Sequence, residues 1–318
     1  MPIYFILRVA SILATLLVVA YSPTQKILLN IVYSLALAHY VLAFVYSRRQ
    51  IADAFRQPYG LVPLLSIVFL GAGLYVGQFS LLFFFGVHHA FNEAFIMRAT
   101  LPSNDPDVKS LRGSAVLVHF LLYLFILRRQ AGLTLSSSNP FYTFVAGYGA
   151  LSKYLPVVLL VGALIVSYGV FFYYLYRVRR LLTVKTVLEN CGLEFLGLFV
   201  AAASFMVFFS YLYFVLYHVV FWSLFPLPKI SAEGKAQLGW YLGLSAACVA
   251  AFVAISPIGP VFTSRYAVSI FQKQFILWTY IHITSSFLLS NAHPEWIVNL
   301  FRPVKSSAAL AEPSTRAA

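Results

Sequence analysis

The sequence predicts an all-α, polytopic integral membrane protein, built as a single helical bundle with about eight or nine transmembrane helices. Of the 318 residues, 61% are hydrophobic, 17% are aromatic and only 10% are charged. A soluble domain usually carries about a quarter charged residues, so this chain cannot cover a surface that faces water. Its apolar residues come in runs of about 20, which is the length that crosses a hydrocarbon layer of about 30 Å as a helix.

The charged residues are strongly basic, with 22 Lys and Arg against 9 Asp and Glu. The positive charges flank apolar runs, as at residues 48–49 and 177–180, which is typical of loops that anchor a membrane protein on its cytoplasmic side. We therefore expect a lipid bilayer, and no nucleic acid, as the partner, and a bacterial plasma membrane as the location. The two cysteines, Cys191 and Cys248, have neither the spacing of a zinc site nor that of a disulfide framework.

The first half of the chain divides into five expected spans. A turn at Ser22-Pro23 ends the first span, and basic residues from Arg48 end the second. The apolar run from 60 to 97 is too long for one span, and we expect a tight turn at 77–80 to divide it. A polar loop at 98–109 then precedes the fifth span. These spans are expected at 3–21, 27–46, 60–76, 81–97 and 111–127.

The second half predicts four more helices. The aromatic run at 192–225 is expected to form one tilted helix, or a helix with an interfacial extension, because Pro226 is the first residue that breaks it. The other three spans are expected at 151–176, 238–255 and 274–290. We therefore expect a single transmembrane domain over 1–302. The Ala-, Ser- and Pro-rich tail at 303–318 is expected to be disordered.

Histidines are concentrated inside the predicted spans, where polar side chains are costly and usually functional. Only His293, of the seven histidines, lies in a loop-like stretch, and Glu93 is the only acid placed well inside a span. The distribution indicates a functional centre within the bilayer. The six histidines inside spans are His39, His88, His89, His119, His218 and His282.

The segment from Gly86 to Glu93 carries the most information. His89 and Glu93 share one helix face, as do His88 and Asn92, while the two adjacent histidines point about 100° apart. Gly86 would let a neighbouring helix approach closely. Imidazole with carboxylate suits iron, zinc, copper or manganese. The alternative for this segment is a pair of interhelical hydrogen bonds that holds no metal.

The depth of the histidines favours a common layer. His39, His88 and His119 each lie about 10–14 Å from the expected cytoplasmic end of their helix, at a rise of about 1.5 Å per residue. Three helices would thus place imidazole nitrogens at one depth, as a buried metal site requires. A simple alternating topology places His218 and His282 nearer the opposite face, which argues against that topology after the fifth helix.

This layout resembles the Brp/Blh family of membrane β-carotene-cleaving dioxygenases. In that family an essential histidine is followed five residues later by an acid, as His88 is by Glu93. His39, His218 and His282 match the family's early, third-region and C-terminal histidines by spacing, and 301–303 resembles the family's ending. The family frames its early histidine with Pro and Gly and pairs its third-region histidine with a second one, and this chain has neither feature. The resemblance implies a metal-dependent oxygenase of lipophilic, isoprenoid-like substrates.

We therefore expect a membrane oxygenase that uses a metal, most simply iron, on a lipophilic substrate of the isoprenoid or carotenoid kind. Glu93 and His89 are the expected catalytic residues or additional ligands. Two other functions stay open: a transporter or channel that relays protons or metal ions along the buried residues, and a haem- or pigment-binding subunit. The expected metal ligands are His39, His88, His89, His119, His218 and His282.

Overall fold

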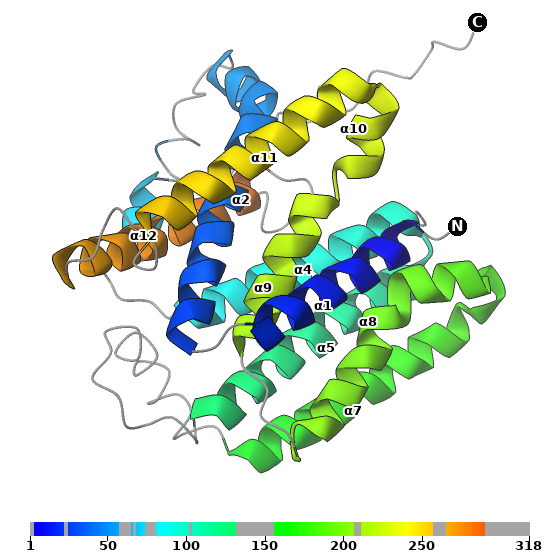
Figure 1. Cartoon of the computed structure of the whole chain (residues 1–318). Coiled ribbons are helices and arrows are strands. Elements are labelled where there is room, and N and C mark those ends of the chain that lie inside the picture. The colour runs from blue at the N-terminus through cyan, green and yellow to red at the C-terminus, as the bar shows by residue number, and fades with distance from the viewer. Residues whose placement is uncertain are drawn as a thin grey trace, which may run out of the picture.

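The computed structural model describes residues 3–21, 25–56, 65, 68–73, 81–101, 104–131, 156–206, 211–256 and 265–289. Within these ranges the regular structure is helical (Figure 1). The helices are α1 (Ile3–Tyr21), α2 (Gln25–Arg56), α4 (Leu81–Thr100), α5 (Pro106–Ala131), α7 (Val157–Arg177), the short 3-10 helix η1 (Arg179–Leu181), α8 (Val184–Ala203), α9 (Tyr211–Leu224), α10 (Leu227–Glu233), α11 (Lys235–Ile255) and α12 (Arg265–Leu289).

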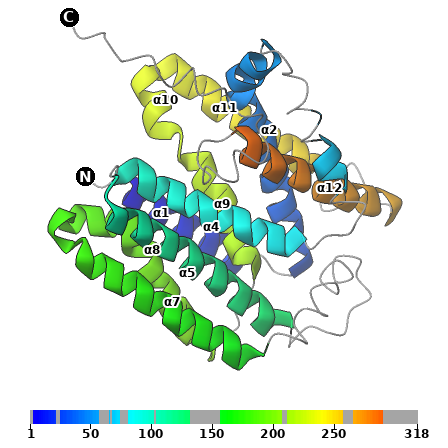
Figure 2. The same cartoon turned by 180° about the vertical axis from the view of Figure 1, so that it is seen from behind.

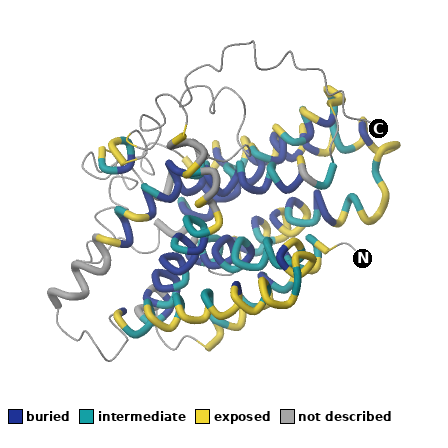
Figure 3. Tube along the Cα trace, turned by 90° about the horizontal axis from the view of Figure 1, so that it is seen from above, coloured by how far each residue is buried: buried dark blue, intermediate teal, exposed yellow. Residues whose placement is uncertain are grey.

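The helices form two groups that meet at α4 and α9. Helices α1, α4, α5, α7 and α8 pack together on one side, and α2, α11 and α12 pack together on the other (Figures 1 and 2). Helix α9 contacts α1 and α5 in the first group and α2 in the second, while α4 contacts α12. The most buried stretches lie where these helices meet, whereas the outer faces are exposed (Figure 3).

The protein is a multi-pass helical membrane protein by the length and composition of its helices. The outward faces carry large apolar side chains, such as Leu17 of α1 and Val166 of α7, which suits contact with lipid. Among the described residues, six segments are long and apolar enough to cross a membrane: Ile3–Tyr21, Pro106–Arg129, Val157–Arg177, Val184–Ala203, Leu212–Glu233 and Lys235–Ile255. The larger count of eight or nine spans stays a prediction.

Most helix boundaries lie close to those expected from the apolar runs. Helix α1 covers the predicted range, and α11 and α12 each begin earlier than predicted. Helix α2 continues ten residues beyond the expected end, to Arg56, because Arg, Gln and Ala favour helix even where the apolar run has stopped. Most of the expected span at 60–76, and the tail at 303–318, lie outside the described residues.

The run at 192–225 is not one helix, and this prediction was wrong. Helix α8 begins earlier, at Val184, with Thr183 as its N-cap, and ends at Ala203. A turn follows at Ser204–Met206, and α9 begins at Tyr211. A single helix over this run would be about 50 Å long, well beyond the thickness of a bilayer. The division adds one reversal to the chain and so changes the direction of every later helix.

Gly86 lets α4 and α5 approach closely, as the sequence analysis predicted. A Cβ atom at Gly86 would lie 2.5 Å from Cδ1 of Tyr123, a completely buried residue of α5. We expect Gly86→Ala to lower the free energy of unfolding by about 1–3 kcal/mol, because the Tyr123 ring must move within a packed core. Thermal unfolding in detergent measures the loss.

The matched control for this substitution is Gly113→Ala, in the N-terminal third of α5. Apart from the backbone of its own helix and its chain neighbours, no atom lies within 4 Å of a Cβ built at Gly113. An added methyl group there therefore meets open space. We expect the control to leave the stability unchanged or to raise it by about 0.5–1 kcal/mol, since alanine favours helix over glycine. Equal losses in the two variants would contradict the close packing at Gly86.

Candidate functional site

The six histidines of the spans converge on one place inside the bundle. They come from α2, α4, α5, α9 and α12, and each is at most 8% exposed. His218 lies next to His39 and His88 rather than near the opposite face, so the placement from simple alternation was wrong. The reversal between α8 and α9 explains the difference, because it turns α9 and α12 the other way. His293 lies outside the described residues.

Four of these residues, His39, His88, His218 and His282, form what we call the four-histidine cluster. Each lies beside two others, with ring centroids 5.0 Å apart for His39–His282, 5.1 Å for His88–His218, 5.6 Å for His88–His282 and 6.0 Å for His39–His218. Imidazoles that share one ion through metal–nitrogen bonds of about 2.1 Å have centroids about 5 Å apart. The cluster therefore has the residue types of a metal site, with ring centroids near this separation.

The imidazoles, as they are placed in the structure, do not form a complete metal-binding site. The ring planes cross at 61° to 85°, edge to face. No group of three or more His, Cys, Asp or Glu side chains among the described residues is arranged to hold a metal ion. Metal binding would therefore require the side chains to move, and χ2 of histidine has broad preferences that permit such movement.

His89 and His119 extend the cluster toward α5 and α8. The His89 ring lies 5.8 Å from that of His218 and 5.8 Å from that of His119, measured between centroids. Nδ1 of His89 and Nδ1 of His218 are buried and make no hydrogen bond within the described part of the chain. A buried polar atom without a partner is costly, so these nitrogens indicate a place where a further polar group or ion would be stabilised.

Two neighbours orient members of the four-histidine cluster. Asn92 Nδ2 lies 2.9 Å from His88 Nε2, one helical turn away, so the amide donates to Nε2 and leaves the ring proton on Nδ1 of the neutral imidazole. Ligation of an ion through Nδ1 would require the Asn92 amide to turn over, so that its oxygen accepts from Nε2–H. The Tyr40 ring stacks on His282 with centroids 4.5 Å apart, and its hydroxyl lies 2.9 Å from Oγ1 of Thr279. Thr279 thus contacts Tyr40 rather than His282, and Ser285 donates to the backbone carbonyl of His282 and not to its imidazole.

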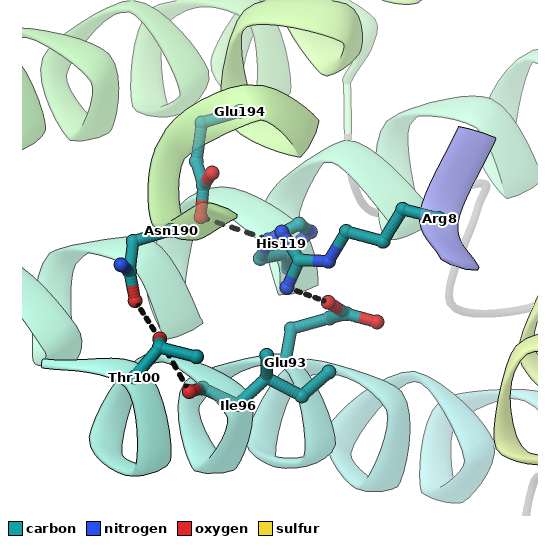
Figure 4. A network of polar contacts seen from close by, with 7 residues as sticks. All are labelled: Arg8, Glu93, Ile96, Thr100, His119, Asn190 and Glu194. Carbon is teal, nitrogen blue, oxygen red and sulfur yellow. Dashed lines mark hydrogen bonds and ion pairs between the residues drawn. The ribbon is translucent and has the colours of Figure 1, made fainter. Parts of the chain in front are cut away.

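A second polar group lies directly beside His89, and we call it the charged quartet: Arg8, Glu93, His119 and Glu194 (Figure 4). Arg8 Nη2 donates to Glu93 Oε2 at 2.8 Å. His119 Nε2 lies 3.0 Å from Glu194 Oε1, so one proton is shared between these two atoms. The four side chains come from α1, α4, α5 and α8 and are at most 4% exposed.

The charged quartet includes two residues that the sequence analysis missed. Arg8 stood out only as a lone charge in the first apolar run. Glu194 lay only two residues from the expected start of its helix at Gly192, so it did not count as an acid well inside a span. Glu93 is therefore not the only acid inside a span. Glu93 is paired with Arg8 and Glu194 with His119, and such pairing is what makes buried polar and charged groups tolerable.

A pocket of about 270 Å³, which we call the lateral pocket, lies between α1, α5, α8 and α9. Its inner end is formed by His89 and His119, which are almost completely buried. Its outer end includes Leu16 of α1 and Phe199 of α8, whose side chains are 53% and 68% exposed on the apolar outer surface. The lateral pocket therefore connects the lipid-facing surface with the histidines.

These features define a class: a multi-pass helical membrane protein with a histidine-rich centre buried inside the bundle. Comparison with known proteins finds no family, no curated protein and no solved structure that matches the chain.

Proposed function

We propose that this chain is a metal-dependent oxygenase of a bacterial plasma membrane, with iron as its metal and a lipophilic molecule as its substrate. The observation that supports this most is the four-histidine cluster, in which four helices bring imidazoles together away from water. An all-imidazole site suits iron, zinc or copper. When bound, iron would supply the chemistry that binds and activates dioxygen.

The surroundings of the cluster favour oxygen chemistry over hydrolysis. The lateral pocket has mostly apolar walls and begins at the lipid-facing surface, so it admits apolar molecules and excludes water. Dioxygen is itself apolar and dissolves in hydrocarbon. A dioxygenase reaction places both oxygen atoms in the substrate and balances without an external electron donor, so this is the form of oxygenase that we propose.

The residues of the protein would have separate roles in this reaction. His39, His88, His218 and His282 would hold the metal. His89 lies between the cluster and the inner end of the pocket, where it would pass protons. Glu93 and Arg8 form a buried ion pair that fixes the charge next to His89, and the His119–Glu194 pair holds a proton at the pocket.

Metal content tests this proposal. We expect the detergent-purified protein, loaded anaerobically with iron(II), to retain about one iron per chain in a histidine site of this kind. His88→Ala should lose most of the iron, because it removes one ligand of the cluster. Cys248→Ala removes a potential ligand on α11 and should leave the iron content unchanged. Elemental analysis of all three samples, with circular dichroism to confirm folding, measures the difference.

Absence of metal from folded wild-type protein would contradict the proposal and favour a second function, a proton- or metal-ion-coupled transporter. One observation supports that alternative. Titratable side chains follow one another from Glu194 through His119 and His89 to His218, with the imidazole centroids 5.8 Å apart at each step. Proton-driven uptake in liposomes would test it. A Soret absorption band from the purified protein would instead indicate a haem-binding subunit.

A further inference from the structure

The lateral pocket has walls of two different kinds. Thr15 is the one hydroxyl on the α1 side, and it already donates to the carbonyl of Ser11 at 2.8 Å. The polar nitrogens of the pocket are confined to its inner end, at His89 and His119. The outer walls contributed by α1 and α8 are otherwise apolar: Ile12, Leu16, Leu193, Leu196, Phe199 and Val200.

The lateral pocket also lies deep in the membrane. Ile12 is near the middle of α1 and His119 near the middle of α5, each roughly 13–20 Å from the ends of its helix. Half of a bilayer core is about 15 Å thick, so this places the pocket near the midplane. The midplane is where the ends of lipid chains lie, whereas headgroups and ester bonds lie at the surface.

The size of the pocket limits what enters it. Pockets that enclose a drug-sized molecule usually measure about 300–1,000 Å³, and the lateral pocket, at about 270 Å³, is smaller. It therefore holds a segment of one chain rather than a whole lipid. A charged or polar headgroup would find mostly apolar walls between Leu16 and the histidines, and would leave most of its hydrogen bonds unmade.

We propose that the lateral pocket binds the terminal part of a single hydrocarbon chain of a membrane lipid, which enters from the bilayer between α1 and α8. The chain end would stand beside His89 and His119, with the headgroup left at the membrane surface. If the bound chain is the substrate, which rests on the proposed oxygenase function, the attacked carbon would lie far from the headgroup. Binding of the chain in the lateral pocket needs no metal.

Photochemical labelling tests the proposal on metal-free protein. The full chain is reconstituted in vesicles of phosphatidylcholine that carries a diazirine either near the terminal methyl of one chain or near its carbonyl. We expect the terminal probe, and not the carbonyl-proximal probe, to label the α8 segment from Leu193 to Val200, as read by peptide mass spectrometry. Equal labelling by both probes, or no labelling of this segment, would overturn the proposal.

A matched pair of variants separates the pocket from the general lipid surface. Leu16 and Leu13 are 53% and 55% exposed on the same helix, but only Leu16 lines the pocket. We expect Leu16→Trp to block the mouth and to lower terminal-probe labelling roughly tenfold, which corresponds to about two buried methylenes. Leu13→Trp should leave labelling unchanged, and an equal fall in both variants would contradict the proposal.

The two proposals can fail separately. If the protein proves to bind no metal but is still labelled by the terminal probe, the oxygenase function is refuted and the chain-binding pocket stands.

Discussion

Replacement of Arg8 by methionine is expected to lower the free energy of unfolding by about 3–5 kcal/mol, the usual cost of leaving a buried charge without its partner. Arg8 Nη2 lies 2.8 Å from Glu93 Oε2, and the two side chains are 3% and 2% exposed. Methionine keeps the length and the apolar stem of the side chain but removes the positive charge. Glu93 would then have to stay charged without a cation or take up a proton. Reversible unfolding in mixed micelles measures the loss.

The double variant Arg8→Met with Glu93→Gln provides the control. Removing both charges removes the penalty, so the double variant is expected to recover at least about 2 kcal/mol relative to Arg8→Met alone. Glu93→Gln alone should destabilise the fold, because it leaves Arg8 buried without its ion-pair partner. Additive losses in the two single variants would show that Arg8 and Glu93 do not depend on each other, which would refute the ion pair.

The helices could largely be predicted from the sequence, because the bilayer fixes the length of an apolar run. This is why the boundaries of α1 and α11 lie close to the expected ones. The break between α8 and α9 could not be predicted from local signals, since neither Gly nor Pro occurs between Ala203 and Ser210. The break follows from helix packing and from the thickness of the membrane, and neither of these can be read from a short stretch of sequence.

The site could be predicted only as a list of residues. Histidines inside apolar spans stand out because each is costly there, whatever its neighbours in space. Their convergence depends on how the helices pack, which one sequence does not contain. The same limit explains why Arg8 was missed as part of the site: its partner Glu93 is 85 positions away, so no local pattern links them. Glu194 was missed because the predicted start of its helix was too late.

The largest effect on metal binding is expected at His218. Its ring lies beside those of His39, His88 and His89, so it has more histidine neighbours than His119, which lies beside His89 and Glu194. If the four-histidine cluster holds the metal, His218→Ala should weaken binding by roughly 100-fold or more, since even supporting residues contribute 10–100-fold. Cobalt(II) titration, followed by its visible absorption, measures both the affinity and the ligand environment.

His119→Gln distinguishes the cluster from its extension toward α8. Glutamine can still donate a hydrogen bond to Glu194 Oε1, which now lies 3.0 Å from the His119 nitrogen, so packing there is largely kept. We expect this variant to bind cobalt(II) with nearly wild-type affinity and an unchanged spectrum, because His119 is not part of the four-histidine cluster. A loss as large as that of His218→Ala, with an altered spectrum, would instead assign His119 to the metal. The ion would then lie nearer the charged quartet, next to Arg8, where a positive guanidinium opposes it.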